Sequence, residues 1–268
     1  MLMSAQEALA DDPLLLRDER NGVVTLTLNR PSRFNALSEE MLSALQAALD
    51  GLKEDQAVRC VVLAASGKAF CAGHDLKQMR AHPRQDYYEA LFAQCSRVMQ
   101  AIVTLPVPVI ARVQGMATAA GCQLVASCDL AVAAQSASFA VSGINVGLFC
   151  STPAVALSRN VAPKRAFDML VTGRFISAAE ALSFGLVNRV APDAELDRAV
   201  DALTAEICAK SPVAIRTGKA MFGRQRSMSL EEAYAYAGHV MACNMMAEDA
   251  AEGIDAFIEK RKPVWKGR

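Results

Sequence analysis

A continuous apolar segment places the strongest constraint on what this chain can fold into. Residues 58–66 read VRCVVLAAS, with six apolar residues in a row before Ser66 and Gly67 close the run. A strand of a parallel sheet is covered on both faces, so its residues are apolar without alternation. The segment therefore predicts a buried strand inside a parallel sheet.

Strand and helix patterns alternate on both sides of this segment. Strands are predicted at residues 22–30, 107–115, 128–134 and 186–191, and helices at 38–52, 85–105 and 118–127. Such alternation is typical of βαβ units, whose strands run parallel. Beyond about residue 154 the pattern becomes mainly helical, and Ser177 with Glu180 and Ser229 with Glu232 match the capping box that begins a helix. The sequence thus predicts an α/β core followed by a helical C-terminal region.

The composition argues against several classes of function. Lysine plus arginine equals aspartate plus glutamate, at 28 each, so no net positive charge draws the chain to nucleic acid. No run of about 18 uncharged apolar residues occurs, so we expect no membrane span. The eight cysteines form no CxxC pair and only three histidines are present, which offers no zinc template and predicts reduced, buried thiols. Residues 1–16 contain acids from Glu7 onward and match neither a signal peptide nor a transit peptide.

Two turns rich in small residues stand out. In the first, Ala72 and Gly73 lie between a predicted strand and Asp75, which suits the N-cap of a helix. In the second, the sequence Ala-Ala-Gly at 119–121 enters a helix. The first N–H groups of a helix lack intrahelical acceptors, and one N–H from each turn could converge on a single oxygen as an oxyanion hole. The alternative is that the small residues only permit close packing of helix and strand.

Taken together, the two turns resemble a known family. The segments GKAFCAGHDLKQM (67–79) and GMATAAGCQLVASCDL (115–130) closely resemble the two signature segments of the crotonase (enoyl-CoA hydratase/isomerase) superfamily. Three more segments resemble the same family in the same order, NRPSRFNALSEEM at 29–41, LVTGRFISAAEALSFGLVNRV at 170–190 and EDAAEGIDAFIEKRKPVW at 248–265. The resemblance therefore runs from about residue 20 to the end of the chain.

This resemblance implies an α/β fold, with a spiral core of ββα turns and a C-terminal helical trimerisation region. On that basis residues 1–20 form an N-terminal extension, 21–200 the core and 201–268 the helical region. The implied ligand is an acyl-CoA thioester, with coenzyme A as part of that ligand and no separate cofactor or metal. The resemblance also implies a homo-oligomer, either a trimer or a dimer of trimers. The implied location is the mitochondrial matrix, with the transit peptide not present in this chain.

The family's site residues carry over to matching positions of this sequence. The resemblance implies that the oxyanion donors are the backbone N–H groups of His74 and Ala120. The family usually has glycine where Ala120 stands. If φ at this residue were positive, the alanine methyl group could narrow the space through which the thioester oxygen reaches the backbone N–H. For coenzyme A, the resemblance implies contacts from Arg33, Phe34, Ala36 and Ala72, and from Phe257 and Lys260 of a neighbouring subunit. Taken by itself, Lys260 is equally a solvated helix charge.

The chain departs from the family at both acid/base positions. Family hydratases hold and activate one water with two glutamates, and the matching residues here are Gln123 and Gly143. A positioned carboxylate contributes roughly 10²–10⁴ in rate, and neither an amide nor a glycine can take its place in proton transfer. Ordinary hydration therefore does not follow, nor does the isomerisation that depends on a glutamate at 143. Restoring both glutamates is expected to raise hydration.

The sequence leaves three functions open, and it does not decide whether the chain is an enzyme. The chain could be an acyl-CoA binder of fatty-acid or lipid metabolism, an enzyme of enolate chemistry such as decarboxylation of a malonyl-type thioester, or a weak residual hydratase. The imidazole of His74 is a substitute base, although its side chain could point elsewhere. Cys122 and Cys150 are expected to be buried, unreactive thiols, and Asp129 is expected to be structural.

Overall fold

The computed structural model describes residues 13–268 and places ten strands of that range in two sheets. The larger sheet contains, in spatial order, β1 (Leu15–Arg20), β2 (Val23–Leu28), β3 (Cys60–Ala65), β5 (Val109–Val113), β7 (Leu130–Ala134) and β10 (Arg189–Ala191). Apart from the antiparallel pair of β1 and β2, all its neighbouring strands are parallel. Every residue of β3 is buried, which confirms the predicted buried parallel strand.

A second sheet gives the chain its repeating unit. It contains, in spatial order, β4 (Ala69–Cys71), β6 (Met116–Thr118), β8 (Ser138–Ala140) and β9 (Ile176–Ser177). Each unit gives one strand to each sheet and then a helix: β3, β4 and α2 (Leu76–Ala81), then β5, β6 and α4 (Ala120–Ser127), then β7, β8 and α5 (Ser151–Leu157). This is the ββα spiral that the resemblance predicted. Hydrophobic periodicity missed β4, β6 and β8 because three residues are too few to show an alternation.

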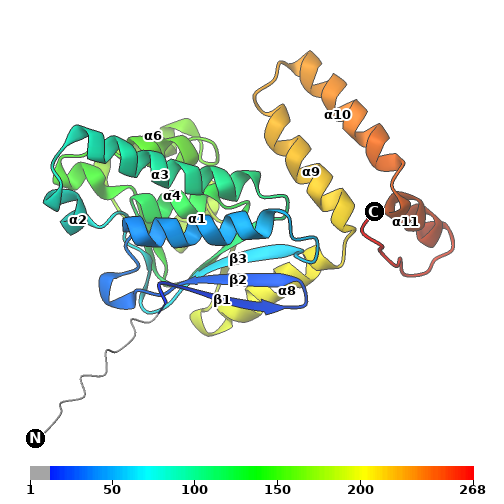
Figure 1. Cartoon of the computed structure of the whole chain (residues 1–268), viewed down its shortest axis with the longest axis horizontal. Helices are drawn as coiled ribbons and strands as arrows, with labels where there is room; N and C mark the ends of the chain where they lie inside the picture. The colour runs from blue at the N-terminus through cyan, green and yellow to red at the C-terminus, as the bar shows by residue number, and fades with distance from the viewer. Residues whose placement is uncertain (1–12) are drawn as a thin grey trace, which may run out of the picture.

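Helices cover both faces of the larger sheet. The remaining helices are α1 (Glu39–Lys53), α3 (Gln85–Thr104), α6 (Pro163–Thr172), α7 (Ala178–Phe184), α8 (Leu196–Cys208), α9 (Pro212–Gln225), α10 (Leu230–Met245) and α11 (Glu248–Ile258). Helices α1 and α3 lie together on one face of this sheet and α8 lies on the other (Figure 1). The Ser38 hydroxyl begins α1 by accepting a hydrogen bond from the N–H of Met41 at 3.3 Å. The apolar positions predicted for this helix are all buried.

The structure adds detail at two of the predicted boundaries. Strand β1 falls within the predicted extension of residues 1–20, yet it pairs with β2 along its whole length. Its sequence LLRDER is mostly exposed, so no apolar pattern marked it; residues 1–12 of that extension lie outside the described residues. Helix α8 begins before the predicted limit at residue 200 and packs on β3, β5, β7 and β10. It therefore belongs with the core.

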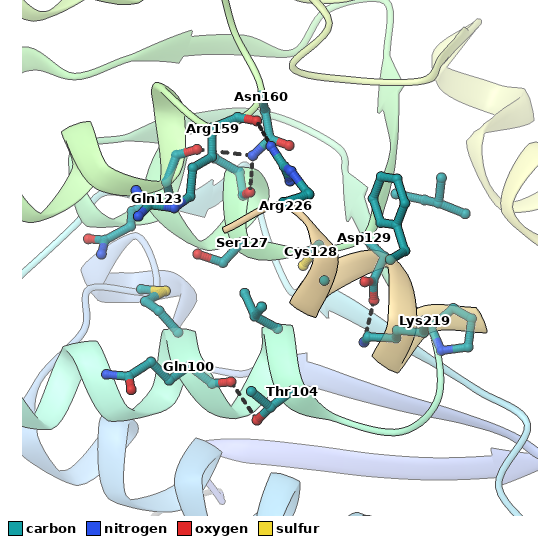
Figure 2. Close-up of a pocket in the computed structure, with 18 of the residues that line it drawn as sticks. Gln100, Thr104, Gln123, Ser127, Cys128, Asp129, Arg159, Asn160, Lys219 and Arg226 are labelled. Atoms are coloured by element: carbon teal, nitrogen blue, oxygen red, sulfur yellow. Dashed lines mark hydrogen bonds and ion pairs between the residues drawn. The ribbon is translucent and has the colours of Figure 1, made fainter. Parts of the chain in front are cut away.

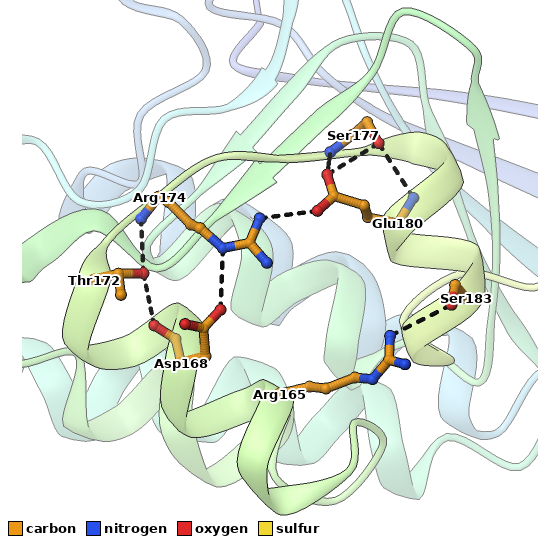
Figure 3. A network of polar contacts seen from close by, with 7 residues as sticks. All are labelled: Arg165, Asp168, Thr172, Arg174, Ser177, Glu180 and Ser183. Carbon is orange, nitrogen blue, oxygen red and sulfur yellow. Dashed lines mark hydrogen bonds and ion pairs between the residues drawn. The ribbon is translucent and has the colours of Figure 1, made fainter.

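Helices α6 and α7 are joined by a surface network (Figure 3). Arg174 donates to Asp168 at 3.0 Å and to Glu180 at 2.9 Å. Glu180 also accepts from the Ser177 N–H, while its own N–H donates to the Ser177 hydroxyl, which is the predicted capping box. The second predicted capping box, at the start of α10, is present as well. The capping box at Ser177 holds β9, the edge strand of the smaller sheet, because Ser177 is the last residue of that strand.

Helices α9, α10 and α11 project from the body of the molecule (Figure 1). A partly buried lysine anchors α9, because Lys219 donates to the carboxylate of Asp129 at 2.6 Å and to the Val107 carbonyl at 2.9 Å. Asp129 also accepts from the N–H of Val109 at 2.7 Å, at the start of β5. Asp129 is therefore structural, as predicted. Within residues 13–268, no helix has both the length and the apolar character that crossing a membrane requires.

The anchor leads to a stability prediction. Lys219→Met leaves the carboxylate of Asp129 with one backbone donor, and we expect the free energy of unfolding to fall by about 2 kcal/mol. Lys53→Met is the matched control, since Lys53 is an exposed residue of α1. Urea unfolding of the two variants measures the difference. An equal effect of both substitutions would contradict the role of Lys219 as an anchor.

Candidate active site

The first of the two turns follows β4. Gly73 has a φ of +90°, a region that glycine enters without steric cost. Two residues later, the carboxylate of Asp75 accepts from the N–H groups of Lys77 at 3.0 Å and Gln78 at 3.2 Å. The predicted N-cap is therefore confirmed, and it begins α2 immediately after the turn.

The second turn connects β6 to α4. Helix α4 begins at Ala120, and the positive φ lies one residue earlier, at Ala119 with φ 50° and ψ −120°. The condition for that effect, a positive φ at Ala120, is therefore not met, because Ala120 is already the first helical residue. The strain instead falls on Ala119, where a non-glycine residue in such a region costs about 1–3 kcal/mol.

The two turns are packed against each other through their glycines. A Cβ atom on Gly73 would lie 2.9 Å from the Cβ of Ala119 and 3.3 Å from the nitrogen of Ala120. A Cβ atom on Gly121 would lie only 2.1 Å from the Cys71 carbonyl oxygen. Among residues 13–268, the backbone N–H groups of His74 and Ala120 have no hydrogen-bond acceptor. Two free donors thus belong to adjacent turns.

The segment predicted to contact coenzyme A lies against the first turn. Ala72 donates its N–H to the Phe34 carbonyl at 3.0 Å, and Leu37 donates its N–H to the Gly73 carbonyl at 2.8 Å. Arg33 and Phe34 are exposed, whereas Ala36 is buried. The structure therefore brings this segment, Ala72 and the His74 turn together.

The two C-terminal positions predicted to contact coenzyme A lie elsewhere. Phe257 belongs to α11 and Lys260 follows that helix, both exposed. Within one chain, α11 lies away from α2 and α4 (Figure 1), so the structure does not bring these residues to the two turns.

Gln123 lies on the wall of a large cavity. The cavity has a volume of about 810 Å³ and is lined largely by apolar side chains of α3, α4, α5 and α9. Figure 2 shows Gln123 and the Asp129–Lys219 ion pair on opposite sides of the cavity. Gln123 is only 4% exposed, and its Oε1 atom has no hydrogen-bond donor among the described residues. The amide is thus placed beside space that an apolar chain could fill.

Gly143 lies on a loop that is tied to the second turn. Strand β8 pairs with β6. Ser142, two residues after the end of β8, shares a hydrogen bond of 2.7 Å with the Thr118 hydroxyl. The N–H of Gly143 donates to the Sγ of Cys150 at 3.2 Å. Neither contact could be predicted from the sequence, because neither pair shows a spacing pattern that indicates a hydrogen bond.

Comparison with known proteins shows the family. A family model described as Enoyl-CoA hydratase/isomerase matches residues 18–268. The chain belongs to the enoyl-CoA hydratase/isomerase family. The protein named "Enoyl-CoA hydratase domain-containing protein 3, mitochondrial" of Xenopus laevis is 44% identical over 263 residues, which are 98% of this chain and 90% of that protein.

Solved structures of this family superpose closely. An enoyl-CoA hydratase of Mycobacterium smegmatis is 64% identical, with a TM-score of 0.94 over 95% of this chain and 99% of the other. The human enoyl Coenzyme A hydratase domain-containing protein 3 is 44% identical, with a TM-score of 0.92 over 94% of this chain and 100% of the other. The predicted resemblance and fold are therefore confirmed.

The imidazole ring of His74 packs against Phe92 of α3. Its two ring nitrogens are buried and have no partner among residues 13–268. The ring lies edge-on to Phe92, with centroids 5.5 Å apart. Burial lowers the pKa of the His74 imidazole. The imidazole is therefore a weaker proton acceptor than an exposed histidine.

The cysteines near the second turn are protonated at neutral pH. Burial raises the pKa of the Cys122 thiol to about 12. Burial also raises the pKa of the Cys150 thiol, an effect that the Gly143 N–H partly opposes. These observations agree with the prediction of unreactive thiols. Within the described part of the chain, no group of three or more His, Cys, Asp or Glu residues could hold a metal ion.

The contact of Gly121 with the Cys71 carbonyl leads to a mutational prediction. Gly121→Ala has no room for its methyl group, and we expect the free energy of unfolding to fall by about 3 kcal/mol as the two turns separate. The control is Gly51→Ala in α1, where a Cβ meets nothing within 4 Å and helix propensity predicts a gain of about 1 kcal/mol. Chemical unfolding measures both. A harmless Gly121→Ala would contradict the packing.

The buried imidazole of His74 leads to a pH prediction. Because its folded pKa lies below the unfolded value of about 6.5, the unfolded chain takes up more protons as the pH falls below that value. Wild type should therefore lose stability between pH 7 and pH 5 more steeply than His74→Leu. Urea unfolding at three pH values measures the two slopes, and equal slopes would show that His74 is not the cause.

Proposed function

We propose that this protein binds an acyl-CoA thioester, with the thioester oxygen accepting hydrogen bonds from the backbone N–H groups of His74 and Ala120. The observation that carries the proposal is the pair of free N–H donors on turns that touch through Gly73. Backbone donors of this kind are fixed before the ligand arrives, and each is worth roughly 2.7–4 kcal/mol when negative charge develops on the oxygen.

The large cavity supports an acyl chain as the rest of the ligand. Its wall is mostly apolar and includes Gln123, one turn along the helix that Ala120 starts. The coenzyme A part would follow the segment of Arg33, Phe34 and Ala36, which the Ala72 hydrogen bond holds beside the first turn. In this proposal the apolar acyl chain and the polar coenzyme A part contact separate surfaces of the protein.

Ordinary hydration is not part of this proposal. A hydratase must deliver a water molecule and a proton, and the two family carboxylates that do so are replaced by Gln123 and Gly143. The glutamine amide can donate and accept hydrogen bonds but cannot exchange a proton near neutral pH. We therefore propose a binding role in acyl-CoA metabolism that does not depend on water addition.

A second candidate function is enolate chemistry on the bound thioester. Two backbone donors with no carboxylate at position 123 or 143 suit a reaction whose main need is stabilisation of an enolate. Loss of carbon dioxide from a malonyl-type thioester is such a reaction, since the electron pair of the broken carbon–carbon bond forms the enolate. Product formation separates this candidate from binding alone.

Assembly and location follow from the family only as proposals. Phe257 and Lys260 are exposed and distant from the two turns of their own chain, so we propose that they serve a neighbouring subunit of a trimer or of a dimer of trimers. For location, several vertebrate relatives are named mitochondrial and the 64% identical protein is mycobacterial. The matrix location therefore stays a prediction.

The proposed function predicts binding without hydration. Titration calorimetry with hexanoyl-CoA, malonyl-CoA, 3-hydroxybutyryl-CoA and free coenzyme A should give tighter binding for the esters than for free coenzyme A, since only the esters offer a thioester oxygen. Product analysis of the same mixtures, with crotonyl-CoA added, should show no hydration near ordinary hydratase rates. Equal affinity for free coenzyme A and its esters would contradict the carbonyl site. Rapid hydration would contradict our interpretation of Gln123 and Gly143.

A further inference from the structure

The loop between β8 and α5 is closed tightly around Gly143. A Cβ atom at this glycine would lie 2.5 Å from the carbonyl oxygen of Leu148 and 2.7 Å from the Sγ atom of Cys150. Both distances are shorter than real Cβ contacts, and one of the two atoms belongs to the backbone. Position 143 therefore accepts no side chain while the loop keeps this conformation.

Backbone hydrogen bonds hold the loop in that conformation. Leu148 donates its N–H to the Gly143 carbonyl at 2.9 Å, and Gly147 donates to the Ile144 carbonyl at 3.1 Å. Gly147 has a φ of +80°, which lets the chain reverse and return toward Gly143. The loop is thus a closed turn, with Cys150 brought back to its beginning.

The thiol of Cys150 occupies the space that a side chain at Gly143 would enter. Its Sγ atom accepts the Gly143 N–H at 3.2 Å, and the residue is 6% exposed. The hydrogen bond between Ser142 and Thr118 holds this part of the loop near the second turn, because Thr118 is two residues before Ala120. The Cys150 thiol therefore lies in the neighbourhood where family hydratases carry their second glutamate.

We propose that Cys150 is a specificity-determining residue: its thiol, which accepts the Gly143 N–H, helps the backbone hydrogen bonds to hold the loop closed, so that neither the Leu148 carbonyl nor the thiol moves aside for a carboxylate at position 143. The proposal rests on the proposed function, since it concerns the chemistry available to a thioester bound at the two turns. It predicts that hydration is prevented by packing as well as by the loss of two acids. Restoring both glutamates, which the sequence alone suggested would raise hydration, should then fail while Cys150 is present.

The packing claim is tested by thermal unfolding. Gly143→Ala should lower the unfolding temperature by about 5 °C, and the same substitution in a Cys150→Ala background should lower it by less than half as much. Gly51→Ala, at an open helical site, is the control that should not lower it. No loss from Gly143→Ala would overturn the proposal, and an equal loss in both backgrounds would assign the restriction to the Leu148 carbonyl instead of Cys150.

The chemical claim is tested by turnover of crotonyl-CoA. The variant Gln123→Glu/Gly143→Glu should hydrate no faster than wild type, whereas adding Cys150→Ala should raise hydration at least ~10-fold above the double variant. Equal turnover by the two variants, at any level, would overturn the proposal. Hexanoyl-CoA binding is also measured for each protein. A wild-type protein that does not bind hexanoyl-CoA would contradict the proposed function, whereas the unfolding temperatures test the packing around Gly143 independently of binding.

Discussion

The backbone of Gly121 lies against the carbonyl of Cys71 so closely that a Cβ atom there would be 2.1 Å from the oxygen. This contact joins the end of β4 to the first turn of α4. Because Gly73 and His74 follow β4 and Ala120 begins α4, the same contact holds together the two turns that carry the free N–H groups. The ββα spiral makes the contact possible, since β4 and β6 are neighbours in the smaller sheet.

The donors and the acid/base positions of the family are separable parts of the site. The donors are backbone groups, and they depend on glycine packing that this chain keeps. In the proposed function, the two acid/base positions are those of Gln123 on α4 and Gly143 on the loop after β8, and neither residue is a carboxylate. We therefore propose that this family member keeps thioester recognition without the proton-transfer groups, and on that proposal membership of the family does not by itself imply hydration.

Much of this arrangement could be predicted from the sequence, because long elements carry clear signals. The buried strand at Cys60–Ala65, the helix capped by Ser38 and the N-cap at Asp75 were all predicted from residue patterns. Strand β1 and the three-residue strands of the smaller sheet were not predicted, since exposure and shortness remove the alternation that marks a strand. The contact between Gly143 and Cys150 depends on a reversal at Gly147, so sequence analysis treated Gly143 as an empty position instead of a closed one.

In the proposed function, the two turns polarise a thioester carbonyl. Infrared difference spectroscopy of hexanoyl-CoA labelled with carbon-13 at the carbonyl tests it directly, because hydrogen bonds to the oxygen weaken the carbon–oxygen bond. We predict that the labelled band moves to lower wavenumber on binding to the wild-type protein. A bound ligand whose band stays at its position in water would contradict the account.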